Sequence, residues 1–214
     1  MFASHDYHRA LALPENPLPR SLRLPEDTDQ NDYHILRPED VLNQATLRCF
    51  RGLGLKACDA ALFYKKPGSL GIIHTDVSLE GGRWRKNVAA VNWNLSGADS
   101  VMRWYDVKTP GTEPDASIAE EENEWYRTLN GIHYGFVGSK THKNLPKNKV
   151  RLLSDSPISL PTLVRTNVPH NVENTDANKG RWALSVRFEH DFDCWAEAVD
   201  AFRPLLVPAA GLAA

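Results

Sequence analysis

The stretch Asn167–Phe188, NVPHNVENTDANKGRWALSVRF, decides the fold. Its pattern predicts two strands joined by a polar turn, with His170 on the first strand. Because side chains alternate between the faces of a strand, four side chains share one face of the second strand: Arg181, Ala183, Ser185 and Arg187. Its opposite face is continuously apolar. A strand with an apolar outside and a cationic, roomy inside predicts a barrel that holds a small anion.

The size and composition of the chain fit one ordinary domain. Its 214 residues are enough for a sizeable core. No apolar run approaches the roughly 20 residues that span a membrane, and the N-terminal residues lack the pattern of a secretory signal. Three scattered cysteines are too few for a disulfide framework or a cysteine-based zinc site: Cys49, Cys58 and Cys194. We therefore expect a cytoplasmic protein with free thiols.

The charge of the chain disfavours nucleic acid as a partner. The net charge is −2, which gives no general attraction to phosphate backbones. Acidic residues gather within 113–124 and basic residues within 140–151. Such runs are usually solvated loops, and contact between the basic run and a phosphate-bearing substrate is the alternative. A small molecule or a peptide is the expected substrate, and the sequence does not indicate an oligomeric state.

The order of the elements predicts a mainly β protein with flanking helices. We expect an irregular arm over 1–37, a helix from Pro38 to Gly52, and a second helix over Phe192–Leu205 before a loose tail at 206–214. Between the helices, alternation and turn signals predict these strands: Ala60–Lys66, Ser69–Ile73, Asn87–Leu95, Val101–Val107, Val150–Leu160, Thr162–Val172 and Arg181–Glu189. A helix followed by about seven short strands is typical of a jelly roll or barrel within a single domain, 38–205.

The stretch from 108 to 147 is an insertion in this domain. It is long, polar and interrupted by glycines, with one possible helix over Ile118–Leu129. Loops of this length inside compact domains are usually functional or disordered. A lid over a pocket and an unstructured insertion are both compatible with the sequence.

A candidate metal site begins at His74 and Asp76, where a strand is expected to run into a polar loop. The His-x-Asp spacing alone is weak, because eight histidines and 27 acidic residues in 214 positions give about one chance match. However, His74 and Asp76 share a strand face, so an imidazole and a carboxylate can converge on one cation. Two histidines and one carboxylate suit Fe(II), Mn(II) or Co(II) and leave positions open. His170 is the best candidate for the second histidine.

The arginines of the second strand fit the needs of such a site. If a 2-oxo acid chelates iron, its far carboxylate needs a rigid cationic anchor, and the planar guanidinium of Arg181 provides one. Ser185 faces the same way and can share the contact. The alternatives are a surface ion pair for Arg181 and ordinary core or loop positions for His74 and His170.

The motifs together resemble a known superfamily, the Fe(II)/2-oxoglutarate-dependent oxygenases. The segments KNVAAVNWNLSG, MRWYDV, VPHNVEN and RWALSVRF resemble, more narrowly, a bacterial and phage group described as aspartyl/asparaginyl hydroxylase-like. The resemblance covers Leu62 to Phe188. It implies a double-stranded β-helix of the jelly-roll, cupin-like type, with iron held by three residues: His74, Asp76 and His170.

The same resemblance implies roles for the residues of the anion pocket. Arg181 corresponds to the anchor of 2-oxoglutarate, and Arg187 matches a second arginine of the nucleic-acid dealkylating branch. Apart from the resemblance, alternation with Val91, Trp93 and Leu95 turns Asn92 and Asn94 to the expected lumen, where they could orient 2-oxoglutarate or an iron-bound water; buried asparagines satisfied by the backbone are the alternative. The expected cofactors are Fe(II), 2-oxoglutarate and O2.

The resulting hypothesis is an oxygenase that hydroxylates, or otherwise oxidises, an unactivated C–H bond of a small molecule or peptide and releases succinate and CO2. Two other classes stay open. One is a cupin-like metal-dependent dioxygenase or isomerase that does not use 2-oxoglutarate, in which Arg181 binds the substrate directly. The other is a non-catalytic barrel that binds an anion without a metal.

Overall fold

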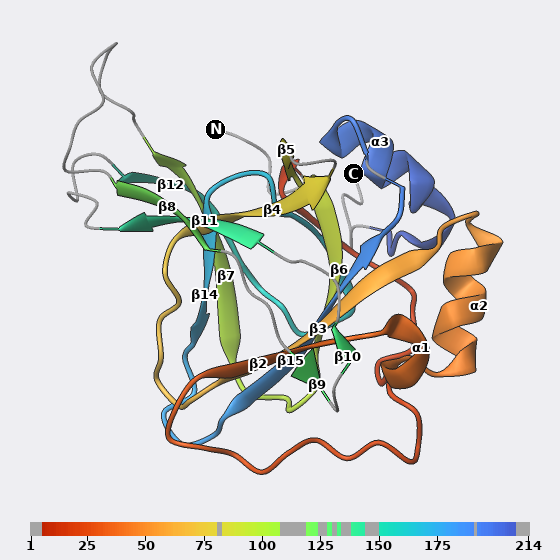
Figure 1. Cartoon of the computed structure of the whole chain (residues 1–214), viewed down its shortest axis with the longest axis horizontal. Coiled ribbons are helices and arrows are strands. Elements are labelled where there is room, and N and C mark those ends of the chain that lie inside the picture. Colours follow the sequence, from red (N-terminus) through yellow and green to blue (C-terminus); the bar gives the residue numbers. More distant parts are fainter. Residues whose placement is uncertain are drawn as a thin grey trace, which may run out of the picture.

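Two antiparallel sheets carry the fold (Figure 1). The computed structural model describes the chain in these segments: 6–80, 83–107, 119–123, 128–129, 132–133, 138–143, 150–190 and 192–208. Within these segments most of the residues with regular structure are in strands, so the predicted mainly β class with flanking helices is confirmed. None of the helices in them has both the length and the apolar character that crossing a membrane requires.

The first sheet has six strands, and β15 lies inside it. In spatial order the strands are β1 (His8–Ala10), β13 (Thr162–Arg165), β6 (Ala89–Asn94), β15 (Arg181–Phe188), β3 (Ala57–Lys65) and β2 (Asp32–Leu36). Every neighbouring pair is antiparallel. Because β15 is flanked by β6 and β3, its backbone hydrogen bonds are made on both sides and its two faces are fixed.

The second sheet has seven strands, and His74, Asp76 and His170 lie on its central pair, β4 and β14. The order is β12 (Val150–Pro157), β7 (Ser100–Val107), β14 (His170–Asn174), β4 (His74–Glu80), β11 (Gly138–Lys143) and β8 (Ala119–Asn123), with β5 (Arg83–Lys86) also paired to β4. Two short strands, β9 (Thr128–Leu129) and β10 (Ile132–His133), form a separate pair among the described residues.

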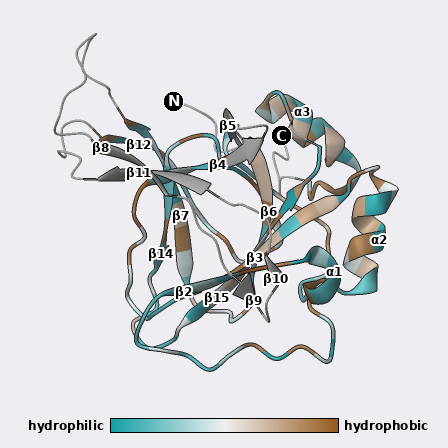
Figure 2. Ribbon diagram, viewed as in Figure 1, coloured by the Kyte–Doolittle hydropathy of each residue, from teal (hydrophilic) through white to brown (hydrophobic). Residues whose placement is uncertain are grey.

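The main core covers the outer face of the six-stranded sheet. Three helices gather there, on the side away from the seven-stranded sheet (Figure 1): α1 (Pro38–Val41), α2 (Gln44–Gly52) and α3 (Trp195–Ala201), which is followed by a 3₁₀ turn, Arg203–Leu205. Phe50 of α2 stacks edge-on against Phe188 of β15, with ring centroids 4.9 Å apart. Brown and teal alternate along α2 in Figure 2, as expected for a helix with one buried face.

A smaller core fills one end of the space between the sheets. Met102 and Trp104 of β7 pack there with Ala90 of β6 and Val164 of β13. The indole of Trp104 is fully buried, and its Nε1 donates a 2.7 Å hydrogen bond to the carbonyl of Arg165. The two sheets are therefore held face to face, and the remaining space between them is available for a site.

Several predicted elements differ in the structure. The helix expected over 38–52 is two helices, since the Asn43 side chain accepts a hydrogen bond from the Thr46 backbone N–H and starts a new helix. The strand expected over Ser69–Ile73 is reduced to one bridge, Leu70 to Glu173, and the strand begins at His74 instead. The arm over 1–37 is not irregular throughout, because it contributes the edge strands β1 and β2.

Two further expectations are corrected. The strand expected over Thr162–Val172 is two strands in different sheets, β13 and β14, because the chain crosses between the sheets over Thr166–Pro169. Within the insertion, the helix expected over Ile118–Leu129 is wrong: the described residues there form β8 and β9. The insertion also holds β10 and β11; its other residues and the end of the tail, 209–214, lie outside the described residues.

Candidate metal centre and anion pocket

A cavity of about 150 Å³ lies between the two sheets. The six-stranded sheet contributes polar side chains from β3, β6 and β15, and the seven-stranded sheet contributes His74, Asp76 and His170. The side chains of Phe63, Met102 and Val172 form an apolar part of the cavity wall. A cavity of this size can take a small ligand, such as a small dicarboxylate.

The three predicted metal ligands come together in this cavity. One ligand atom from each of His74, Asp76 and His170 can be chosen so that all lie within 4.8 Å of one another. The Nε2 atoms of His74 and His170 lie 3.6 Å and 3.9 Å from Oδ1 of Asp76. Within the described part of the chain, this is the one group of histidine, cysteine and acidic side chains that could hold a metal ion.

Sheet register explains why residues nearly one hundred positions apart meet. His74 and Asp76 are two residues apart on β4 and therefore project from the same face. His170 opens β14 and lies directly opposite His74 in the antiparallel pair. Their ring centroids are 4.5 Å apart. The triad thus depends on the β4–β14 pairing as much as on the residue types.

Backbone carbonyls set the protonation of both imidazoles. Nδ1 of His74 lies 2.9 Å from the carbonyl oxygen of Ile72, and Nδ1 of His170 lies 2.8 Å from that of Val168. A carbonyl can only accept, so each Nδ1 carries the proton and donates it, which leaves the lone pair of each Nε2 facing Asp76. Metal-ligating histidines commonly have this arrangement, because the second hydrogen bond fixes both tautomer and ring orientation.

Arg187 holds the remaining oxygen of Asp76. Its Nη2 donates a 2.5 Å hydrogen bond to Oδ2 of Asp76, and both side chains are buried. Burial alone would raise the pKa of Asp76, but Arg187 and the two nearby imidazoles outweigh it and hold that pKa below its usual value. Asp76 is therefore ionised, with Oδ1 directed to the triad. Sequence reasoning placed Arg187 on the cavity face but did not find this partner.

Burial also keeps His170 neutral. It lowers the pKa of His170 to about 4, with the neighbouring His74 acting in the same direction. A neutral imidazole is the form that ligates metal. The site therefore offers two imidazole nitrogens and one carboxylate oxygen, which is the donor set of a three-ligand site with open positions.

Arg181 lies at a different place in the same cavity, and no acidic side chain among the described residues pairs with it. It is 3 % exposed, and its Nε is buried without a hydrogen-bond partner among the described residues. Burial lowers its pKa to about 10, so it still carries its charge at neutral pH. A buried guanidinium without an acidic partner is costly unless an anion joins it. The predicted cationic inner face of β15 is thus present.

The structure adds one cation that the sequence reasoning missed. Lys65, the last residue of β3, lines the cavity and lies directly opposite Arg181. Burial, and then the nearby Arg181, lower the pKa of Lys65 to about 8. The one sequence signal for this residue was a lysine at the end of an apolar strand. The face of β3 on which its side chain lies could not be assigned before the strand was paired with β15.

The other predicted pocket residues divide into two groups. Ser185 and Asn92 lie directly opposite each other on neighbouring strands and both line the cavity. Oδ1 of Asn92 is buried with no described hydrogen-bond partner, so it is available to a ligand. Asn94, by contrast, does not line the cavity, because its Nδ2 donates a 2.7 Å hydrogen bond to the carbonyl of Ala98 and closes the following turn.

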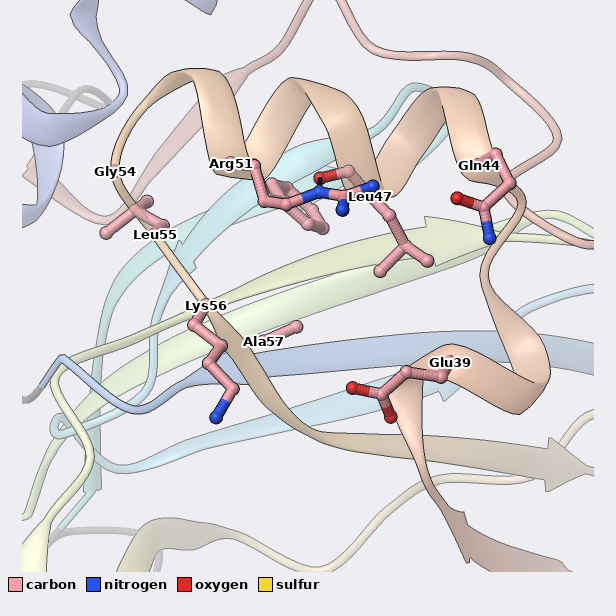
Figure 3. Close-up of a pocket in the computed structure, with 9 residues that line it drawn as sticks. Glu39, Gln44, Leu47, Arg51, Gly54, Leu55, Lys56 and Ala57 are labelled. Carbon is pink, nitrogen blue, oxygen red and sulfur yellow. Dashed lines mark hydrogen bonds between the residues drawn. The ribbon is translucent and has the colours of Figure 1, made fainter.

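A larger groove of about 480 Å³ lies elsewhere, between α1, α2 and the start of β3 (Figure 3). Leu47, Leu55 and Ala57 form its apolar part, and the charged side chains of Glu39 and Lys56 lie near them. Lys56 already forms a 2.5 Å ion pair with Glu189. This groove lacks the buried, unneutralised groups of the inter-sheet cavity, and we place the candidate chemistry in the smaller cavity.

Comparison with known proteins adds no assignment to this geometry. No protein-family model matches the chain, and no curated protein is similar to it.

Proposed function

We propose that this protein is an Fe(II)- and 2-oxoglutarate-dependent oxygenase built on a double-stranded β-helix. The observation that carries the proposal is the presence of two complementary sites in one small cavity. One is the group of His74, Asp76 and His170, and the other is the buried, unneutralised Arg181. Two facing antiparallel sheets with the site between them support the fold assignment.

The donor set favours iron among the metals. Two imidazoles and one carboxylate are typical of non-haem Fe(II) oxygenases, and the absence of cysteine from the group disfavours the thiolate sites preferred by zinc and copper(I). His74, Asp76 and His170 would hold the metal, and Arg181 would hold the far carboxylate of 2-oxoglutarate. The chemistry supplied by the bound pair would be O2-dependent oxidation of an unactivated C–H bond, with release of succinate and CO2.

The chain itself contributes binding, orientation and exclusion of water. The carbonyls of Ile72 and Val168 hold each histidine in the tautomer that presents Nε2. Arg187 keeps Asp76 ionised and fixes its rotamer through Oδ2. The apolar wall of the cavity lowers the local dielectric and strengthens the contact between Arg181 and a carboxylate. The primary substrate we propose is a small molecule or a peptide side chain.

Succinate formation tests the proposal. Protein purified without chelator is supplied with Fe(II), 2-oxoglutarate and air, and slow uncoupled turnover is measured as succinate by mass spectrometry. We expect succinate above a heat-treated control, and none from His74→Ala. Bound metal without succinate would favour a cupin-like enzyme that does not use 2-oxoglutarate. A His74→Ala variant with unchanged metal content would favour a metal-free anion-binding barrel.

A further inference from the structure

Two like charges face each other across the β3–β15 pair. Lys65 and Arg181 are direct partners in the antiparallel register, and both side chains line the cavity. Like charges directly opposite each other destabilise a sheet, and burial increases the cost because less water screens them. No acidic side chain is paired with either cation among the described residues. Folding alone gives no reason for this pairing.

The other end of the same strand pair shows the opposite arrangement. Arg187 lies directly opposite Asp59, and it also donates to Asp76. Asp59 and Asp76 both raise the pKa of Arg187 against the effect of burial. One arginine of β15 is therefore compensated twice by the protein, while the other faces a second cation. Among the described residues, acidic partners are therefore present at the Arg187 end of the β3–β15 pair and lacking at the Arg181 end.

Lys65 is held in place by a close approach of the loop before β4. A Cβ atom on Gly71 would lie 2.9 Å from Nζ of Lys65 and 2.8 Å from the carbonyl oxygen of Val172. The backbone of Gly71 is fixed there, because its N–H donates a 2.9 Å hydrogen bond to that same carbonyl. The ammonium of the half-buried lysine thus lies close to the backbone of Gly71.

We propose that Lys65 and Arg181 form a two-cation anchor that binds the far carboxylate of the dicarboxylate cosubstrate. The proposal rests on the oxygenase function above and adds Lys65 as a residue that determines affinity for the cosubstrate. One carboxylate has two oxygens and about four acceptor positions, enough for a guanidinium and an ammonium together. The bound carboxylate offsets one of the two positive charges and reduces the repulsion between them, so the charges that destabilise the empty cavity become the source of affinity.

The anchor has a consequence for the pH dependence of binding. Lys65 has a pKa of about 8 in the ligand-free protein, and its charge is therefore lost as the pH rises through that value. The charged groups that share the cavity with Lys65 are Arg181, Arg187, Asp76 and the two histidines. The two arginines keep their charge near pH 8. Affinity for the cosubstrate should accordingly fall above neutral pH.

Calorimetric titration of 2-oxoglutarate into the full chain loaded with Mn(II) tests the anchor without requiring turnover. Lys65→Met should raise the dissociation constant about tenfold, the effect expected for one lost hydrogen bond to a charged group. Lys65→Arg should stay within about threefold of wild type, because the cation is retained. For wild type, the dissociation constant should rise about threefold from pH 7 to pH 8.5, and Lys65→Arg should abolish that rise.

Lys66→Met is the matched control, because Lys66 is the next residue, is exposed and lies outside the cavity lining. It should bind 2-oxoglutarate as wild type does. If Lys65→Met binds as tightly as wild type while Arg181→Met does not, the two-cation anchor is wrong and the oxygenase proposal is unaffected. If Mn(II) does not enable 2-oxoglutarate binding, but glutarate binds the metal-free chain in a Lys65-dependent way, the anchor stands and the oxygenase proposal fails.

Discussion

Arg187 and Asp76 join the two sheets through a 2.5 Å hydrogen bond between buried side chains. Arg187 comes from β15 of the six-stranded sheet and Asp76 from β4 of the seven-stranded sheet. The backbone of Asp76 is also held by residues that flank strands of the first sheet: its N–H donates to the carbonyl of Thr166, which follows β13, and its carbonyl accepts from Asn87, which precedes β6. Three contacts outside its own sheet therefore position the residue that carries the carboxylate of the candidate metal centre.

Replacing Arg187 should weaken the metal centre and destabilise the fold. Arg187→Met leaves Asp76 buried and without its partner, which typically costs about 3–5 kcal/mol. Loss of such a supporting contact also lowers metal affinity about 10- to 100-fold. Chemical denaturation of the metal-free protein and calorimetry with Mn(II) measure the two effects.

Arg203→Met is the control for this change, because Arg203 pairs with Asp200 on the surface. Exposed pairs contribute only about 0–1 kcal/mol, so this variant should match wild type in both measurements. Equal behaviour of the Arg187 and Arg203 variants would contradict the role given to Arg187.

Arg181 should behave in the opposite way to Arg187. Burial lowers its pKa to about 10, so its charged form is disfavoured in the folded state and costs stability at neutral pH, where it is fully charged. Arg181→Met removes that cost and the repulsion with Lys65. We expect a higher melting temperature, unchanged Mn(II) affinity and loss of 2-oxoglutarate binding. A lower melting temperature with intact 2-oxoglutarate binding would show that Arg181 is a structural residue.

Metal should stabilise the chain only through the three predicted ligands. At a metal concentration 100 times the dissociation constant, linkage adds about 2.7 kcal/mol, or roughly 5–10 °C of melting temperature for a chain of this length. EDTA should remove the shift, and His170→Gln should show none. The same shift in His170→Gln would place the metal elsewhere.

Two glycine substitutions should have opposite effects. Gly71→Ala places a Cβ 2.8 Å from the carbonyl oxygen of Val172, so backbone must move, and we expect a loss of about 1–3 kcal/mol together with weaker 2-oxoglutarate binding. Gly52→Ala, at the last residue of α2, meets nothing within 4 Å. It should be neutral or stabilise by up to about 1 kcal/mol. Urea denaturation distinguishes them, and equal values would contradict the packing described for Gly71.

The sequence predicted the site better than the elements that carry it. Side-chain alternation on Arg181–Phe188 was enough to place Arg181, Ser185 and Arg187 on one cavity face, and the structure agrees. The facing of Lys65 and the partner of Arg187 could not be predicted, because both depend on pairings between distant strands. Alternation predicted that Asn94 faces the lumen, but its amide donates a local hydrogen bond to the carbonyl of Ala98 and does not line the cavity.

The predicted strand ends were wrong where the backbone hydrogen bonds depend on pairing within the second sheet. Apolar residues recur through Thr162–Val172 and predict one continuous strand, yet the chain changes sheets between β13 and β14. That crossing places His170 at the start of a strand opposite His74. In the same way, β4 begins at His74 because its partner β14 begins at His170. The described residues just before His74 have one bridge to β14, between Leu70 and Glu173.

Anaerobic titration of the metal-free protein with Fe(II) and then 2-oxoglutarate tests the central claim most directly. Chelation of iron by the 2-oxo acid gives a visible charge-transfer absorption. We predict that this band appears in wild type at one equivalent of iron, is absent in His74→Ala, and needs much higher 2-oxoglutarate in Arg181→Met. Absence of the band in folded wild-type protein, or an unchanged 2-oxoglutarate requirement in Arg181→Met, would contradict the proposed function.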